Sequence, residues 1–66
     1  MEHHTNMLRM GEVCRRTGLS KSQIYRLVGE VEFPKPIKLS ARAMAFVEAE
    51  VERWLQQRIA ESRQVA

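Results

Sequence analysis

Residues 18–24, which run Gly18-Leu19-Ser20-Lys21-Ser22-Gln23-Ile24, carry adjacent signals that organise the rest of the chain. Gly18 follows a short periodic segment, at the position where helices commonly end in a left-handed residue. Ser20, followed by Gln23 three residues later, matches a capping box at the start of a second helix, and Leu19 with Ile24 matches the accompanying hydrophobic staple. One helix is therefore predicted to end and another to begin here, and the chain is expected to reverse direction between them.

The segments on either side of this turn have the apolar spacing of short helices. In residues 10–17 the apolar side chains fall at i, i+3 and i+4, which is one face of a helix. In the second helix the apolar stripe runs from Ile24 to Val28, which leaves Ser22 and Arg26 on the opposite face. Two short helices joined by a tight glycine-containing turn match the helix-turn-helix pattern, in which the second helix enters the major groove of DNA.

The second half of the chain predicts a β-hairpin followed by a third helix. Phe33-Pro34-Lys35-Pro36 cannot continue a helix, because proline lacks an amide hydrogen and favours extended geometry before it. Residues 37–39 and 42–46 alternate as half-buried strands do, around a turn placed at Ser40-Ala41. From Val47 the apolar residues recur at helical spacings. The predicted fold class is mainly α with a small β-hairpin, a winged helix-turn-helix with the order α-α-β-β-α.

The length of 66 residues allows one domain with a thin core, because so short a chain buries only about 60% of the surface of its unfolded form. The domain is expected to span residues 8–60, with a disordered segment at 1–7 and a frayed tail at 61–66. Trp54 is expected to make the largest single contribution to the core. The single cysteine, Cys14, allows no intramolecular disulfide, so stability must come from packing.

The sequence carries no pattern that indicates an enzyme, a metal site, a cofactor site or a small-molecule ligand. Cys14 falls on an apolar helical face, and no glycine-rich phosphate loop is present. His3 and His4 are adjacent and have no third ligand nearby. No apolar run approaches the ~20 residues that span a bilayer, and the start of the chain lacks the features of a signal peptide. We therefore expect a cytoplasmic protein that makes no contact with a membrane.

Positive charge is concentrated in the first two-thirds of the chain. Residues 8–42 contain eight basic and three acidic residues, a net charge of +5, whereas residues 43–66 carry a net charge of −1. A segregated positive field is what a phosphate-binding surface requires. The expected partner is double-stranded DNA.

On the second helix, Arg26 can make a bidentate contact to guanine O6 and N7, and Ser22 can donate to a base edge or a phosphate oxygen. Lys21 and Tyr25 are expected to contact the DNA backbone, which sets register without reading sequence. The alternative for each charged side chain is a solvated helix surface, and Tyr25 can instead be a half-buried aromatic residue.

In the hairpin, Lys38 and Arg42 flank the turn, where they can straddle a phosphate or enter the minor groove as a wing does. Lys35 lies at the base of the hairpin. The alternative is an exposed edge strand protected by charge. The full set of predicted DNA-binding residues is Arg16, Ser20, Lys21, Ser22, Gln23, Tyr25, Arg26, Lys35, Lys38 and Arg42.

Several of these stretches together resemble the AlpA family of phage and prophage regulatory proteins. The resemblance covers residues 8–60, and its most specific blocks are Thr17-Gly18-Leu19-Ser20, Ile24-Tyr25-Arg26 and Phe33-Pro34-Lys35-Pro36. It implies a small winged helix-turn-helix related to the MerR and excisionase types, which regulates prophage genes through the helix that starts at Ser20 and through the wing. The chain departs from the family at Ser40-Ala41, where glycine is usual.

Three functions fit these observations. The first is a sequence-specific transcriptional regulator, and the second is an excisionase-like factor that bends DNA for a recombinase. The third is a protein-interaction module, such as an anti-repressor, that uses the apolar face of the last helix. Because one such domain covers few base pairs, tight binding calls for a homodimer or a cooperative oligomer on DNA.

Overall fold

The computed structural model describes residues 5–64 and contains three helices and three strands. In chain order they are β1 (Met7–Leu8), α1 (Met10–Thr17), α2 (Lys21–Gly29), β2 (Ile37–Ser40), β3 (Ala43–Val47) and α3 (Glu48–Gln64). The predicted fold class and the predicted order of helices and hairpin are confirmed, and β1 is an addition. Residues 1–4, which include His3 and His4, and residues 65–66 lie outside the described residues, as do the expectations made for them.

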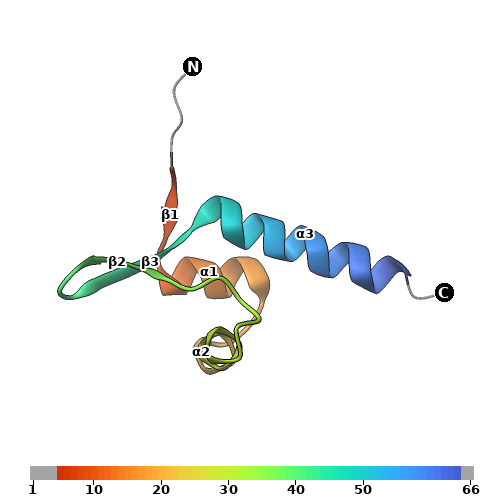
Figure 1. Cartoon of the computed structure of the whole chain (residues 1–66), viewed down its shortest axis with the longest axis horizontal. Coiled ribbons are helices and arrows are strands. Elements are labelled where there is room, and N and C mark those ends of the chain that lie inside the picture. Colours follow the sequence, from red (N-terminus) through yellow and green to blue (C-terminus); the bar gives the residue numbers. More distant parts are fainter. Residues whose placement is uncertain (1–4, 65–66) are drawn as a thin grey trace, which may run out of the picture.

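The hairpin formed by β2 and β3 and the helix α3 project to opposite sides of a body made by α1 and α2 (Figure 1). In that view α2 is seen end-on while α1 lies across it, so the two helices cross steeply. The strands form one antiparallel sheet in the order β1-β3-β2. Met7 pairs with Val47 and Leu8 with Phe46, so the sheet ties the segment before α1 to the strand that leads into α3.

The turn between α1 and α2 has the predicted chemistry. Gly18 caps α1 in the left-handed region with φ of 76°, and its amide donates to the carbonyl of Cys14 at 2.8 Å. The capping box of α2 is complete: the amide of Gln23 donates to Ser20 Oγ at 3.1 Å, and the amide of Ser20 donates to Gln23 Oε1 at 2.8 Å. Local sequence alone therefore sets both ends of this turn.

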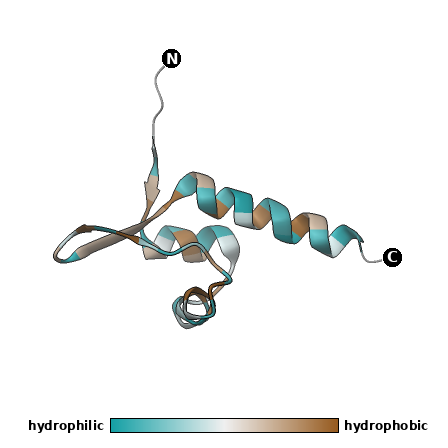
Figure 2. Cartoon of the chain, in the orientation of Figure 1, coloured by the Kyte–Doolittle hydropathy of each residue, from teal (hydrophilic) through white to brown (hydrophobic). Residues whose placement is uncertain are grey.

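The core is one small cluster of six apolar residues drawn from β1, all three helices, β3 and the loop after α2. Its members are Leu8, Val13, Ile24, Phe33, Phe46 and Val51. The rings of Phe33 and Phe46 meet edge to face with centroids 5.7 Å apart. Each such side chain contributes about 1.5–3 kcal/mol by leaving water. Figure 2 shows that the hydrophobic residues of α3 form separate bands between hydrophilic ones along the helix.

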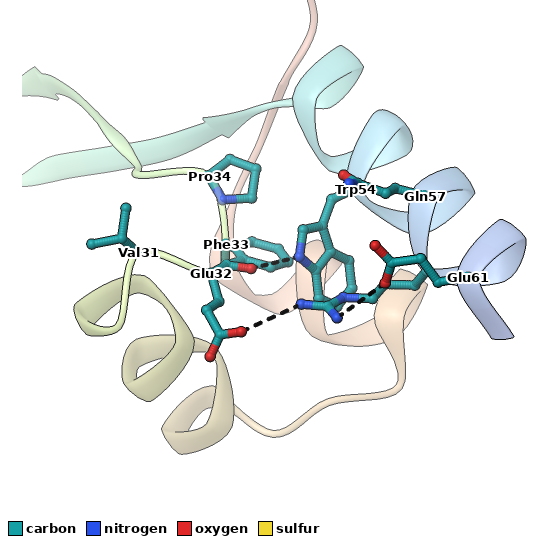
Figure 3. Close-up of a pocket in the computed structure, with 8 residues that line it drawn as sticks. Val31, Glu32, Phe33, Pro34, Trp54, Gln57 and Glu61 are labelled. Atoms are coloured by element: carbon teal, nitrogen blue, oxygen red, sulfur yellow. Dashed lines mark hydrogen bonds and ion pairs between the residues drawn. The ribbon is translucent and has the colours of Figure 1, made fainter.

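Trp54 lies at the rim of this core and is only partly buried, so the innermost positions belong to smaller side chains than expected. Its ring packs edge to face on Phe33 with centroids 4.8 Å apart. The indole Nε1 donates to the carbonyl of Glu32 at 2.6 Å (Figure 3). The guanidinium of Arg58 lies over the ring, 5.0 Å from its centroid. Trp54 thus joins α3 to the loop that follows α2.

The turn of the hairpin lies one residue later than predicted. Ser40 still pairs with Ala43, so the turn residues are Ala41 and Arg42, and the register shifts between Lys38 and Ser40. Two-residue hairpin turns of the favoured primed types need positive φ, and neither turn residue has it. The register shift between Lys38 and Ser40 is a β-bulge, in which an extra residue bends the strand and increases its twist. The bulge therefore supplies the twist that a primed turn would otherwise give.

Both ends of the described chain are more regular than the sequence suggested. Met7 pairs in β1, although residues 1–7 were expected to be disordered. The helix α3 begins at Glu48 and continues to Gln64, past the predicted domain end at residue 60. Good helix formers and an i,i+3 ion pair between Arg58 and Glu61, with 3.5 Å between Nη1 and Oε1, support these last turns. No helix among residues 5–64 is both long and apolar enough to cross a membrane.

The end of α2 contains the one strained backbone position among residues 5–64. Val31 has φ of 58°, and its amide donates to Val28 O while the amide of Glu32 donates to Leu27 O. These two bonds define a Schellman motif, whose left-handed residue is usually glycine. The Val31 side chain is 76% exposed, so packing does not offset the strain of a β-branched residue there.

Candidate nucleic-acid interface

A groove lies between the start of α1, the outward side of α2 and the wing. Four cationic side chains line it, one from the residue before α1, one from α2 and two from the hairpin: Arg9, Lys21, Lys38 and Arg42. Gly11, Tyr25 and Met44 are among its other lining residues. We call this surface the basic groove. It joins Lys21 and Tyr25 of the second helix with Lys38 and Arg42 of the hairpin, as the helix-and-wing prediction requires.

The cations of the basic groove have no acidic neighbours in its wall. No carboxylate is among the lining residues, and within residues 5–64 none of the four cations takes part in an ion pair. All four are exposed, and Lys21 Nζ lies 6.0 Å from the centroid of the Tyr25 ring. Uncompensated positive charge on a concave surface, interleaved with an aromatic ring, is suited to a polyanion.

The rest of the outward face of α2 is available to solvent. Ser22 and Arg26 are exposed and lie outside the basic groove. The side chains of Ser20 and Gln23 are also exposed, but their oxygens are engaged in the capping box. Ser20 and Gln23 therefore hold the start of α2 in position. Ser22 and Arg26 are the polar side chains of α2 that remain available outside the groove.

Arg16 is not brought together with the other predicted residues. Its Nε donates to Glu12 at 3.0 Å, and its Nη1 lies 3.0 Å from Glu48 Oε2 at the start of α3. A hydrogen bond from Arg15 and a weaker contribution from a hydrogen bond of Arg16 lower the pKa of Glu12 from 4.5 to about 2. A hydrogen bond from Asn6, followed in size by one from Arg16, lowers the pKa of Glu48. The charge of Arg16 is thus balanced by carboxylates of its own protein.

Lys35 also lies apart from the basic groove. It lines a separate shallow depression next to Glu50 and Arg53 of α3. The side chain is exposed, but Lys38 and Arg42 of the hairpin line the basic groove and not this depression. Lys35 is therefore not brought together with the cations of the hairpin.

Sequence reasoning missed five residues of the basic groove: Arg9, Met10, Gly11, Ala41 and Met44. Arg9 was counted in the basic segment, yet no local pattern connects it to a wing that is some thirty residues away in the chain. Met44 pairs with Lys38 across the hairpin, and this pairing follows from a register that the misplaced turn obscured. Among residues 5–64 no group of three or more His, Cys, Asp or Glu side chains is placed to hold a metal ion.

A capped helix-turn-helix followed by a hairpin, with a cationic concave face between them, defines the protein as a winged helix-turn-helix. The model of one family, described as prophage CP4-57 regulatory protein (AlpA), matches residues 6–59. The chain belongs to this AlpA family.

Two curated proteins are similar to the chain. The uncharacterized protein ORF88 of Enterobacteria phage P4 is 42% identical over 53 residues, which is 80% of this chain. The chain spans 60% of the length of that phage protein. The DNA-binding transcriptional activator AlpA of Escherichia coli (strain K12) is 31% identical over 58 residues, which cover 79% of this chain and 83% of that protein.

Proposed function

We propose that this protein is a sequence-specific, DNA-binding transcriptional regulator of prophage genes, with α2 in the major groove and the wing on the DNA backbone or in the minor groove. The observation that carries the proposal is the basic groove, which unites α2 and the wing on one face without an acidic residue. The name of the related Escherichia coli protein supports it. The role is one of binding and not of catalysis, and it assigns the protein to the bacterial cytoplasm.

In this proposal the residues of α2 divide the work of recognition. Arg26 and Ser22, which are exposed beyond the groove, reach base edges. Lys21 and Tyr25, which line the groove, contact phosphates and sugars and so fix the register of the helix. Ser20 and Gln23 contribute by holding the first turn of α2, whose free amides can meet a phosphate.

The wing supplies the second part of the contact. Lys38 and Arg42 lie on the groove side of the hairpin and neutralise the backbone that borders the major groove. Because a single domain covers few base pairs, we propose that tight binding comes from a homodimer or from cooperative binding to repeated sites.

The test is a titration of the protein against duplex DNA from its own upstream promoter and against a scrambled duplex of equal length, at two salt concentrations. Tighter binding to the promoter that survives the higher salt supports sequence-specific regulation, because specific contacts depend less on counterion release. Absence of binding to either duplex at low salt contradicts the proposal and favours the protein-interaction alternative.

A second candidate is an excisionase-like factor that bends DNA. The observation that favours it is the apolar surface of the wing, where Leu39 is 52% and Ile37 45% exposed on the edge strand β2. Apolar side chains presented to the minor groove can wedge between base steps and kink the duplex. A circular-permutation bending assay separates the two roles, because a regulator that does not bend DNA shifts all permuted fragments equally.

A further inference from the structure

The start of α1 brings three residues to the basic groove: Arg9, Met10 and Gly11. Met10 also packs against the core, whereas Arg9 and Gly11 have no part in the core or in recognition by α2 and the wing. Arg9 precedes α1, yet its side chain makes no capping hydrogen bond to the helix. It is exposed, and within residues 5–64 it forms no ion pair. It lines the groove with Lys21, Lys38 and Arg42. Nothing in the described fold therefore requires a cation at this position.

Gly11 has no structural explanation either. It lies in the first turn of α1 without positive φ, so no left-handed backbone calls for glycine. A Cβ built there meets nothing within 4 Å, so no close packing calls for it. Glycine in a helix costs about 1 kcal/mol relative to alanine. What the missing side chain does is leave the α1 side of the groove open, next to Arg9.

The geometry points to a third DNA-contacting element: we propose that Arg9 and the backbone edge of α1 at Gly11 close the basic groove around one phosphodiester strand of the duplex. The inference rests on the proposed function. Cations from three separate parts of the chain line the same groove. This arrangement suits a DNA strand, which presents several phosphates in succession, better than it suits one isolated phosphate. The exposed surfaces of Tyr25 and Met44 offer apolar contact to the deoxyribose between phosphates.

In this arrangement Arg9 binds DNA without reading its base sequence. A phosphate contact strengthens binding to every duplex equally and adds close to one released counterion to the salt dependence. The absent side chain of Gly11 also favours binding to every duplex, but for a steric reason. Any group placed there would occupy the path of the DNA strand. Both effects are therefore measurable on DNA of unrelated sequence, and the operator need not be known.

The experiment measures fluorescence anisotropy of a fluorescein-labelled duplex of unrelated sequence against the wild-type protein and four variants, over a series of salt concentrations. Arg9→Gln is paired with Arg63→Gln, which removes an exposed arginine from the last turn of α3. Gly11→Glu is paired with Ala60→Glu, which makes the same change in net charge at an exposed position of α3. Thermal melts by circular dichroism accompany each variant.

Arg9→Gln should lower the magnitude of the slope of log K against log salt by about 0.9 and weaken binding roughly threefold to tenfold at moderate salt. Gly11→Glu should weaken binding by about tenfold or more without lowering the melting temperature, since glutamate suits the first turn of a helix. The two α3 variants should bind as the wild-type protein does.

The outcomes separate the two proposals. If the wild-type protein binds DNA but Arg9→Gln and Gly11→Glu match their α3 controls, the third element is wrong and the role of α2 and the wing stands. If the wild-type protein binds no duplex even at the lowest salt, the proposed function fails and this inference fails with it.

Discussion

Arg16 of α1 and Glu48 at the first residue of α3 form an ion pair, with Nη1 3.0 Å from Oε2. The same guanidinium is bonded to Glu12 on its own helix, so one arginine links two elements that are far apart in the sequence. This arrangement differs in kind from the uncompensated cations of the basic groove. We therefore expect Arg16 to hold α1 and α3 together, although the sequence predicted it as a DNA-binding residue.

Arg16→Gln should therefore lower the melting temperature and leave the salt dependence of DNA binding unchanged. The physical reason is that its positive charge is already balanced by Glu12 and Glu48, so few counterions are released through it. Thermal melts and salt-dependent titrations of the same variant measure the two effects. A slope that falls by about one would instead make Arg16 a phosphate contact.

The stability of the protein should depend on pH through Glu12. Hydrogen bonds from Arg15 and Arg16 lower its pKa from 4.5 to about 2 in the folded protein. The folded state thus binds fewer protons than the unfolded state between these values. The contribution of Glu12 is fully present above about pH 4.5 and is lost as the pH falls toward 2.

Thermal melts between neutral and acidic pH check this expectation. Glu12→Gln should flatten the loss of melting temperature between pH 4.5 and 2, because glutamine does not titrate. Glu50→Gln, which removes a carboxylate that forms no ion pair within residues 5–64, should retain the wild-type dependence. Equal flattening by both substitutions would show that the pH dependence does not come from the Glu12 cluster.

The parts of the fold that the sequence predicted are those governed by local chemistry. Gly18 and the Ser20–Gln23 capping box act over a few residues, so they can be recognised without knowledge of the tertiary structure. The strand β1 could not be recognised, because a two-residue strand exists only through its pairing with Phe46 and Val47. The turn at Ala41 and Arg42 lacks the glycine or asparagine that would have located it.

The candidate site divides in the same way. Lys21 and Tyr25 were predicted because their helix and its outward face could be derived from apolar spacing. Arg9 was missed because its neighbours in the groove, Lys38 and Arg42, come from a distant hairpin. The ion pair between Arg16 and Glu48 was missed for the same reason, since it depends on how α3 packs beside α1.

Val31→Gly should stabilise the protein by about 1 kcal/mol, because glycine adopts the left-handed conformation of the Schellman motif without strain. Part of the relief is offset by the greater freedom of glycine in the unfolded chain. Urea unfolding measures the change. Glu30→Gly is the matched control: its φ of −89° is accessible to any residue, so it should gain nothing. A loss of stability in Val31→Gly would show that the strain is not relieved.

Trp54→Ala should cost about 3 kcal/mol, the lower end of what large-to-small aromatic substitutions cost, because the ring lies at the rim of the core. Trp54→Phe keeps the contact with Phe33 but removes the hydrogen bond to the carbonyl of Glu32, and should cost about 1 kcal/mol. Chemical denaturation of both variants checks the ranking. Equal losses would mean that the hydrogen bond, and not the packing, joins α3 to the loop after α2.

Arg26→Ala and Lys38→Ala should differ in which property of DNA binding they change. Arg26 lies on the outward face of α2 beyond the groove, so its loss should cost about 1–3 kcal/mol at one base position and relax specificity there. Lys38 lines the groove from the wing, so its loss should weaken binding to all duplexes and lower the salt slope by about one. Titrations against a set of singly substituted promoter duplexes measure both properties. A residue that reads bases must discriminate among sequences, whereas a residue that contacts phosphates cannot. Identical effects of the two substitutions across all sequences would therefore contradict the assignment of base recognition to Arg26 and of phosphate contact to Lys38.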